Sequence, residues 1–399
     1  MSDPKAALPD PVSSDAIKAL LTSKGIRASA SITPLRVTAA YHSLYLVILS
    51  EAAGEGKDVV QVDELILRVS GRHLPNIKTR NEVGVMTWIR RNTKIPIPEI
   101  VAWDATSDNP IGHEYTLLRK ASGVAMSDVY TELTEEQQLH VLHQLIDYLT
   151  ELHSFQWDGI GGLVLKDDAV GDAVILSQVV DETFWQTLDV AQFWNPGDST
   201  DSLNIKGPYS TYLDLVCARI QKSVDLIQKH ESLVFMRDAV PRIDALLSNL
   251  STRRMQSDDP DALNQVKLRL AHKDLHFANI LVDPLTADIT AILDWEFAGV
   301  VPYIEWNPSR AFLWNGRDDD DDSFDEKQRW MKRFEECCRE RGAEYLVEDA
   351  KFSSPLQESL HKIHNYLRAI VEVSPRGQRQ DLVQGWKNTV LENLAAFGV

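Results

Sequence analysis

Most of the polar side chains that could do chemistry stand in one short segment. Residues 268–283 have the sequence LRLAHKDLHFANILVD, in which an apolar run is interrupted by His272 and Asp274 and resumes after Asn279. Asp294 follows at the end of the next apolar run, in ITAILDWE. A His-x-Asp-x4-Asn pattern arises by chance in about one chain in fifty of this length. Here a strand-like run lies on each side of it, and an acidic residue closes the next one. This is the order of a kinase catalytic loop and its metal-binding Asp.

Phosphoryl transfer accounts for each residue type in this pattern. Its transition state is loose and negatively charged, so the protein mainly positions groups and neutralises charge. We expect Asp274 to orient the acceptor hydroxyl and to take its proton. We expect Asn279 and Asp294 to supply one amide oxygen and one carboxylate to Mg2+, which keeps several of its waters. The structural alternative is that Asp274 only caps a turn and that Asp294 only ends a strand. In either case we expect His272 to brace the loop through hydrogen bonds.

Two groups of elements must hold these residues in place. Up to about residue 120 the pattern predicts a small α+β lobe, with a short helix from Ser14, strands at 43–49 and 64–71, a helix at 79–93, an edge strand in 95–104 and a strand in 113–123. From about residue 122 it predicts a mainly helical lobe, starting with a capping box at Thr134 and Gln137. Further helical patterns lie at 209–230, 238–250, 324–340, 355–372 and 380–397, and short strands are expected only between 266 and 300.

The composition of the 399-residue chain excludes several classes of protein. Apolar residues make up 44% and charged residues 25%, as in ordinary globular proteins. The net charge is −18 and there is no long Lys/Arg block, which argues against nucleic acid or an anionic membrane as the main partner. The three cysteines match no metal-ligand spacing, and no apolar run is long enough to span a bilayer. Since residues 1–15 also lack the pattern of a targeting signal, we expect a soluble, cytoplasmic protein.

The segment HKDLHFANIL resembles the catalytic stretch of the aminoglycoside phosphotransferase-like family of small-molecule kinases, which is related to choline kinases. The chain is especially similar to fungal members, over about residues 30–315. The family's usual stretch is His-Gly-Asp-Leu-His-x-x-Asn-Ile-Leu, from which this chain differs mainly by Lys273 in place of Gly. The resemblance implies a protein-kinase-like, two-lobed α+β fold that uses ATP and Mg2+. It divides the chain into a nucleotide-binding lobe at 1–120, with a flexible tail at 1–15, and a helical lobe at 121–399 that carries the catalytic loop and the acceptor site.

The same resemblance implies the residues that meet the nucleotide. Arg68, in LILRVSG, stands where a Lys or Arg contacts phosphate, and Glu82 stands as its ion-pair partner. Backbone groups near Arg119 and Ala121 would meet adenine, and Ser43 would lie near the loop that covers the phosphates. That loop, in VTAAYHSLYL, contains no glycine. The alternative for the Arg68–Glu82 pair is a salt bridge that only stabilises the lobe.

The sequence therefore predicts a small-molecule O-phosphotransferase. The alternative is a catalytically silent nucleotide-binding protein or scaffold of the same fold, favoured by the glycine-free loop, by Lys273 and by Arg68. The acceptor, the choice between ATP and GTP, and the oligomeric state are left open. The run Asp318–Asp322 is either a solvated loop or a feature that attracts a cationic acceptor. Four residues are expected to belong to the core rather than to an acceptor-side wall, namely Trp295, Glu296, Trp306 and Trp314.

Overall fold

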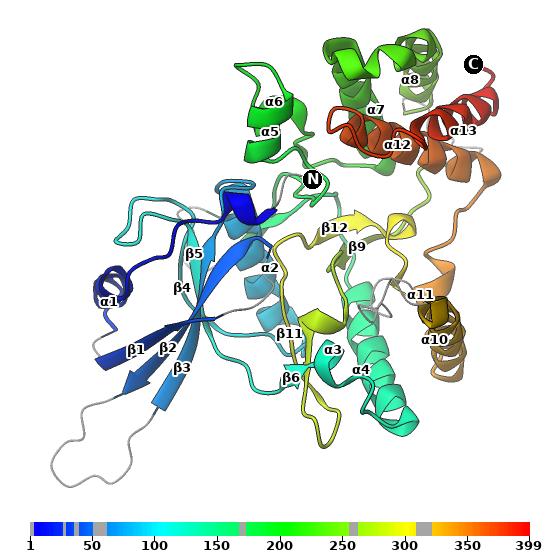
Figure 1. The fold of residues 1–399 in the computed structure, drawn as a ribbon. Coiled ribbons are helices and arrows are strands. Elements are labelled where there is room, and N and C mark those ends of the chain that lie inside the picture. The colour runs from blue at the N-terminus through cyan, green and yellow to red at the C-terminus, as the bar shows by residue number, and fades with distance from the viewer. Residues whose placement is uncertain are drawn as a thin grey trace, which may run out of the picture.

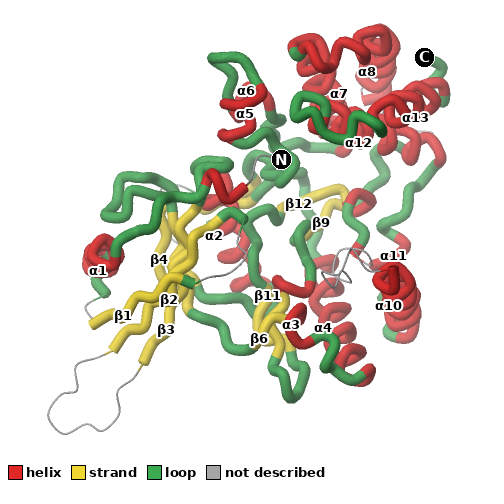
Figure 2. Tube along the Cα trace, in the orientation of Figure 1, coloured by secondary structure: helices red, strands yellow, loops and turns green. Residues whose placement is uncertain are grey.

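The computed structural model describes residues 4–26, 29–35, 40–50, 62–166, 173–254, 262–308 and 321–399. These residues form a lobe built on a sheet and a larger, mainly helical lobe (Figure 1). The strands of the first lobe gather on one side of the molecule, and most helices lie on the other (Figure 2). Among the described residues, no helix combines the length and apolar character needed to cross a membrane.

The sheet of the first lobe has five antiparallel strands in the order β1-β2-β3-β5-β4. The strands are β1 Ser29–Pro34, β2 His42–Ser50, β3 Val62–Ser70, β4 Ile100–Asp104 and β5 Tyr115–Arg119. The proline-rich segment forms the edge strand β4, as its sequence predicts. Strand β1 was not predicted, because SASITP offers only Ala30 and Ile32 as alternating apolar residues.

The two faces of this sheet are covered differently. One face packs on α1 (Ser14–Ser23) through Ile17, Leu20 and Leu21, which are almost fully buried. The other face, which carries Arg68, turns toward α2 (Ile77–Asn92) and the helical lobe. This division follows from the alternation of side chains along a strand.

The first fifteen residues differ from the predicted flexible tail. Residues Pro4–Ala7 form the short 3-10 helix η1, and the carbonyl of buried Ala7 accepts a hydrogen bond from the N–H of Arg72 at 3.0 Å. Helix α1 begins at Ser14 with Ser13 as its N-cap, one residue before the predicted cap. The described part of this segment is therefore packed on the sheet lobe.

The helical lobe contains the predicted helices. Helix α4 (Glu135–Ser154) has the expected capping box between Thr134 and Gln137 and buries its apolar stripe. The other long helices are α7 Tyr212–Lys229, α8 Val240–Arg254, α10 Asp321–Glu340, α12 Pro355–Val373 and α13 Val383–Ala395. Shorter elements are α3 Met126–Val129, α5 Thr187–Phe193, α6 Thr200–Leu203, α11 Tyr345–Glu348, the 3-10 helices η2 Glu231–Ala239, η3 Phe277–Asn279 and η4 Tyr303–Glu305, and the strands β7 Leu163–Leu165 and β8 Val174–Leu176.

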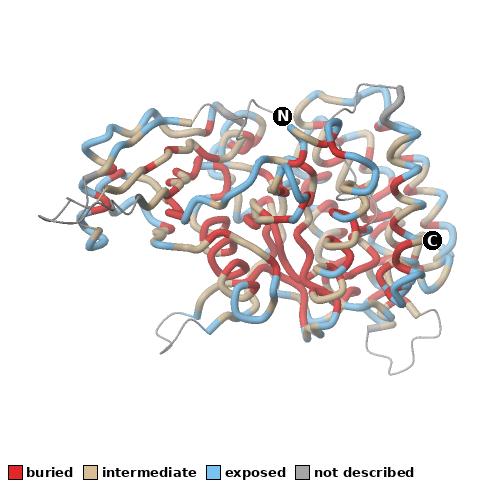
Figure 3. Tube along the Cα trace, turned by 90° about the horizontal axis from the view of Figure 1, so that it is seen from below, coloured by how far each residue is buried: buried red, intermediate tan, exposed pale blue. Residues whose placement is uncertain are grey.

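A small insert of strands runs through the middle of this lobe, where buried positions are concentrated (Figure 3). Its strands are β9 Leu268–Ala271, β10 Ile280–Val282, β11 Ile289–Ile292 and β12 Gly299–Pro302. Strand β10 lies between β11 and the short β6 (Val124–Ala125), and β12, which was not predicted, pairs with β9. The catalytic loop thus joins β9 to β10, and Asp294 follows β11. The predicted two-lobed, protein-kinase-like α+β fold is confirmed.

Candidate active site

A cleft of about 860 Å³ lies between the two lobes. Its walls include Arg68 from β3, Ala121 from the connection between the lobes, Asp274 and Asn279 from the catalytic loop, and Asp294 from the turn after β11. These residues are up to 226 positions apart in the chain, yet the fold brings them to one cavity. Pockets of this size between two units of structure are usual places for small-molecule sites.

Arg68 connects the two lobes at the back of the cleft. Its guanidinium forms an ion pair with buried Glu82 of α2, and its Nη2 donates to Oδ1 of Asp294 at 2.6 Å. The predicted Arg68–Glu82 pair is present, and it is more than a support inside the sheet lobe, because the same side chain also holds the proposed metal ligand.

Two hydrogen bonds fix the turn that presents Asp294. The N–H of Leu293 donates to the carbonyl of Asn279 at 2.8 Å, and Nε2 of buried His272 donates to the carbonyl of Leu293 at 2.7 Å. Burial lowers the pKa of His272 to about 4, so its ring is neutral near pH 7. His272 therefore braces the loop, as expected from the sequence.

Asp274 and Asn279 are joined directly. Nδ2 of Asn279 donates to the backbone carbonyl of Asp274 at 2.9 Å and lies 3.4 Å from its Oδ2. Burial, together with the negative charges of Asp294 and Glu182, raises the pKa of Asp274 to about 7, although the contact with Asn279 opposes the shift. A carboxyl with this pKa can exchange a proton near neutral pH, which suits a general base.

Asp294 has the opposite electrostatic character. Burial alone would raise the pKa of this carboxyl, but the adjacent Arg68 and the charge of Lys78 hold the pKa below its usual value. Arg68 bonds to Oδ1, and no described residue forms a hydrogen bond with Oδ2. The nitrogen of Asn279 is bonded to Asp274, so its amide oxygen is the atom that a cation can use. This pair of oxygen donors fits Mg2+.

Three charged or polar residues at the same wall were missed as site residues. Lys78 and Glu296 form an ion pair in which each side chain is only 1% exposed. His42 lies between the cations, with Nε2 3.2 Å from Lys78 Nζ and Nδ1 3.3 Å from a nitrogen of Arg68. Nε2 is also 3.4 Å from Glu296, so a neutral ring protonated on Nε2 can donate to Glu296 and accept from Arg68. Lys78 lies one helical turn before Glu82 on α2, and this spacing could have identified Lys78 as a residue on the same face as Glu82.

Ser43, expected near the loop that covers the phosphates, is not among the residues that line the cleft. His42 and Leu44, its neighbours on β2, both line the cleft. Successive side chains of a strand point to opposite faces, so Ser43 points to the face that carries Tyr45 and Val47 and packs on α1. The side chain of Ser43 is therefore directed away from the cleft.

The connection between the lobes offers fewer backbone groups than expected. The N–H of Arg119 donates to the carbonyl of Glu99 at 2.8 Å, and its exposed side chain pairs with Asp63 and Glu99. The N–H of Lys120 donates to the carbonyl of Glu64 at 2.9 Å. Arg119 and Ala121 both line the cleft, and Ala121 is the better candidate for a backbone N–H contact with a base because the N–H of Arg119 is already paired.

Lys273 replaces the family's glycine at a position where the backbone favours glycine. Its φ is 66°, in the left-handed region. Its ammonium donates to the carbonyl of Val180 and lies 3.4 Å from Asp181 Oδ2. The side chain thus ties the catalytic loop to the segment before α5, and these contacts offset part of the backbone cost.

Several expectations fall on residues outside the described part of the chain. Residues 37–39, at the start of the predicted phosphate-covering loop, are among them, although Leu35 and Ala40 on either side of the gap at 36–39 line the cleft. Trp314 and Asp318–Asp320 are also outside it, and Asp321 and Asp322 open α10. Trp295 and Trp306 are buried, as expected for core residues, whereas Glu296 is buried but also lines the cleft.

Residues 52–190 match the model of the phosphotransferase enzyme family. The family resemblance predicted from the sequence is confirmed. The matched range contains β3, α2 and β5 and ends before the catalytic loop. The match to this phosphotransferase family supports a small-molecule phosphotransferase fold.

The curated relatives are fungal. A subtelomeric hrmA-associated cluster protein of Aspergillus fumigatus is 25% identical over 262 residues, which cover 56% of this chain and 50% of that protein. The clavilactone A biosynthesis cluster protein Y of Ampulloclitocybe clavipes is 26% identical over 57% of this chain and 51% of that protein. The chain thus spans about half the length of the curated relatives it matches.

Solved aminoglycoside phosphotransferases are similar to the chain over nearly its whole length. The GDP complex of an aminoglycoside 2'-phosphotransferase is 14% identical, with a TM-score of 0.47, and covers 96% of this chain and 97% of its own. A thermostable mutant in complex with AMP-PNP and hygromycin B is 16% identical, with a TM-score of 0.45, and covers 96% and 98%.

Proposed function

We propose that this protein transfers the γ-phosphate of ATP, with Mg2+, to a hydroxyl of a small molecule. The observation that carries the proposal is the convergence of Asp274, Asn279 and Asp294 on one cleft, with Arg68 joining Asp294 to Glu82. This set contains a base, two oxygen ligands and a cation, which are the parts that phosphoryl transfer requires.

Each residue has one role in the proposed reaction. The amide oxygen of Asn279 and Oδ2 of Asp294 would hold Mg2+, which when bound neutralises phosphate charge. Arg68 adds a fixed positive charge at the same wall. The carboxylate of Asp274 would orient the acceptor hydroxyl. The hydroxyl oxygen then bonds to the γ-phosphorus, the bond from phosphorus to the leaving oxygen of ADP breaks, and the hydroxyl proton passes to Asp274.

The acceptor is proposed to be a small molecule that carries an amine. The acidic run at 318–322 motivates this proposal. A second acidic group lies at the cleft itself, since Glu182 lines it together with Asp274. A negative wall would raise the local concentration of a cationic acceptor, and salt would screen the effect over roughly 10 Å at 0.1 M.

The test is to measure ADP release from purified protein with MgATP and a panel of hydroxyl-bearing metabolites, with and without amines. Acceptor-dependent ADP release and a phosphorylated product are expected. MgATP binding without turnover on any acceptor would favour the silent nucleotide-binding protein. Equal turnover of neutral and amine-bearing analogues at low salt would contradict the proposed acceptor charge.

A further inference from the structure

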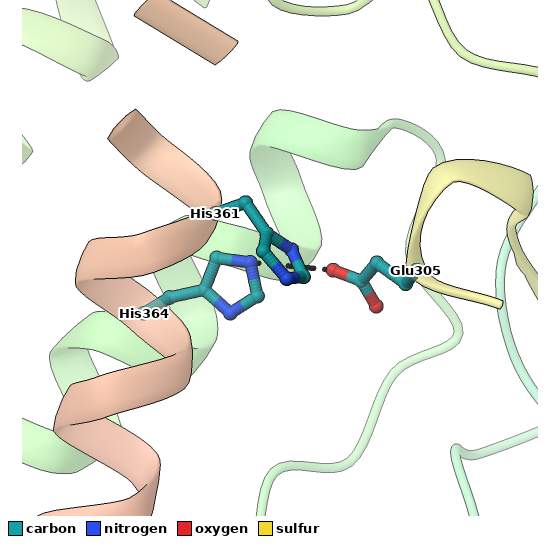
Figure 4. A group of neighbouring side chains, drawn as sticks. All are labelled: Glu305, His361 and His364. Atoms are coloured by element: carbon teal, nitrogen blue, oxygen red, sulfur yellow. Dashed lines mark ion pairs between the residues drawn. The ribbon is translucent and has the colours of Figure 1, made fainter. Parts of the chain in front are cut away.

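A second cavity, of about 280 Å³, lies in the helical lobe. Three potential metal ligands line it, namely Glu305 of η4 and His361 and His364 of α12. Their side chains point toward one another from the two elements (Figure 4). One ligand atom from each residue lies within 4.8 Å of the others.

The local structure explains why these side chains meet. His361 and His364 are three residues apart on α12, so they share one face of the helix. Glu305 ends η4 and faces them across the cavity. Nε2 of His364 and Oε1 of Glu305 are 3.3 Å apart. Two ligand atoms about 2.0–2.1 Å from one tetrahedral zinc ion would be separated by about 3.3–3.4 Å.

A buried nitrogen of His361 points to a missing ligand. Its Nδ1 is shielded from solvent and has no hydrogen-bond partner among the described residues. Leaving a buried polar atom unpaired costs about 1–3 kcal/mol. Coordination of a cation would remove this cost.

Neighbouring groups orient the carboxylate. Nη1 of Arg219 donates to both oxygens of Glu305, at 2.7 and 2.8 Å, and the hydroxyl of Tyr212 lies 3.5 Å from Nε2 of His364. Outer partners of this kind commonly fix metal ligands in place. The negative charge of Glu305 and the positive charge of Arg219 cancel each other, so the two neutral imidazoles would supply most of the affinity for an added cation.

We propose that Glu305, His361 and His364 bind a divalent transition-metal ion of the Zn2+ class. Two imidazole nitrogens and one carboxylate oxygen suit such an ion better than Mg2+ or Ca2+, which prefer oxygen ligands. Three protein ligands leave one coordination position for water or for an oxygen or nitrogen of a small molecule in the cavity, the arrangement of open zinc sites. This site is distinct from the Asn279–Asp294 pair, which lines the cleft between the lobes, and it does not depend on the proposed phosphotransfer.

The test uses the full-length protein freed of metal with a chelator. Titration with Zn2+ by calorimetry should give one bound ion per chain and a higher Tm, and Co2+ should give the visible absorption of a four-coordinate site. His361→Ala should weaken Zn2+ binding at least tenfold. His140→Ala, which removes an exposed histidine paired with Asp288, is the matched control and should bind as the parent does.

Two further variants keep the test decisive. His361→Gln retains a polar side chain and serves if His361→Ala unfolds, and Asp294→Ala removes the proposed ligand in the cleft. Binding lost in the His361 variant and kept in Asp294→Ala supports the site. The proposal would be overturned if the parent protein bound no stoichiometric Zn2+, or if the His361 variant bound Zn2+ as tightly as the parent. It would also be overturned if Zn2+ binding were lost only in Asp294→Ala.

Discussion

The back and the front of the cleft use charged residues in different ways. At the back, Lys78 and Glu296 are each 1% exposed and pair with each other, and Arg68 pairs with Glu82 and Asp294. At the front, the side chain of Asp274 is 38% exposed, and among the described residues it contacts Asn279 and His276 rather than a Lys or Arg. Paired buried charges hold positions, whereas a carboxylate without a cation keeps a raised pKa and can accept a proton. The proposed division of labour between scaffold and base follows from this difference.

The largest expected effect comes from removing the base. Asp274→Asn should lower phosphate transfer by about 10²–10⁴-fold or more, because the acceptor hydroxyl loses its proton acceptor while the ligands of the cation survive. Turnover is measured under saturating MgATP and acceptor. Asp288→Asn, the same change at an exposed carboxylate of the β10–β11 turn, should keep parental activity. Near-parental turnover by folded Asp274→Asn would mean that another group is the base.

Breaking the buried pair should affect stability first. Lys78→Met leaves Glu296 without its cation, which typically costs about 3–5 kcal/mol of unfolding free energy. Burial raises the pKa of Glu296 and Lys78 opposes this, so in the variant Glu296 should be neutral over a wider pH range. The loss should therefore be smaller at low pH, where Glu296 is protonated, and grow as pH rises. Urea unfolding at pH 5.5 and 8.5 measures it.

The control for this variant is Lys120→Met. Lys120 pairs with Glu64 at 2.7 Å, but both side chains are more than 40% exposed, so the loss should be about 0–1 kcal/mol. Equal losses in the two variants would show that burial does not distinguish the pairs.

Removing either proposed oxygen ligand should have a smaller, graded effect. Asn279→Ala and Asp294→Ala are each expected to weaken binding of MgATP by about 10–100-fold, because each removes one oxygen donor. Calorimetry with MgATP and with ATP plus chelator measures the difference. The metal assignment fails if both variants bind MgATP as tightly as the parent does.

The smallest effect concerns pH. The folded pKa of Asp274 is raised to about 7, so the carboxyl favours folding when protonated, and this contribution is lost as pH rises from about 4 to about 7. Asp274→Asn should therefore stabilise the folded protein at pH 8 by about 1 kcal/mol, once the partial exposure of the side chain is allowed for. This gain corresponds to an increase in Tm of about 2 °C, and the increase should be smaller at pH 5. In the parent, kcat/KM should fall below about pH 7. A Tm gain that is equal at both pH values would contradict the raised pKa.

The local pattern of the sequence was sufficient to predict the site residues of the loop, but it was not sufficient to predict the buried residues that pair with each other. Asp274 and Asn279 lie five positions apart in one turn, so their spacing predicted that both belong to the same loop, where they are in contact. Lys78 and Glu296 are 218 positions apart, and neither has a local pattern that identifies its partner. For the same reason the convergence of Glu305 with α12 could not be predicted, since it depends on how η4 packs against that helix.

Strand register and edge strands set the other limit. The helices were predicted well because their apolar stripes are long and their caps are local, as in α4. The face of β2 that meets the cleft was not predicted, because a shift of one residue in a strand exchanges the two faces. Strands β1, β6, β7, β8 and β12 were missed because two to six residues give too few alternations to be recognised.

The contacts of Arg68 have a consequence for movement of the lobes. Arg68 and Glu82 both belong to the sheet lobe, so their ion pair is kept when the lobes turn about the connection near Ala121. The 2.6 Å contact with Asp294 joins Arg68 to the helical lobe, so any opening of that hinge must break it. A cation that takes up the charge of Asp294 weakens the same contact. If the cleft binds a cation, we therefore expect its loading to be coupled through this guanidinium group to any rotation of the lobes.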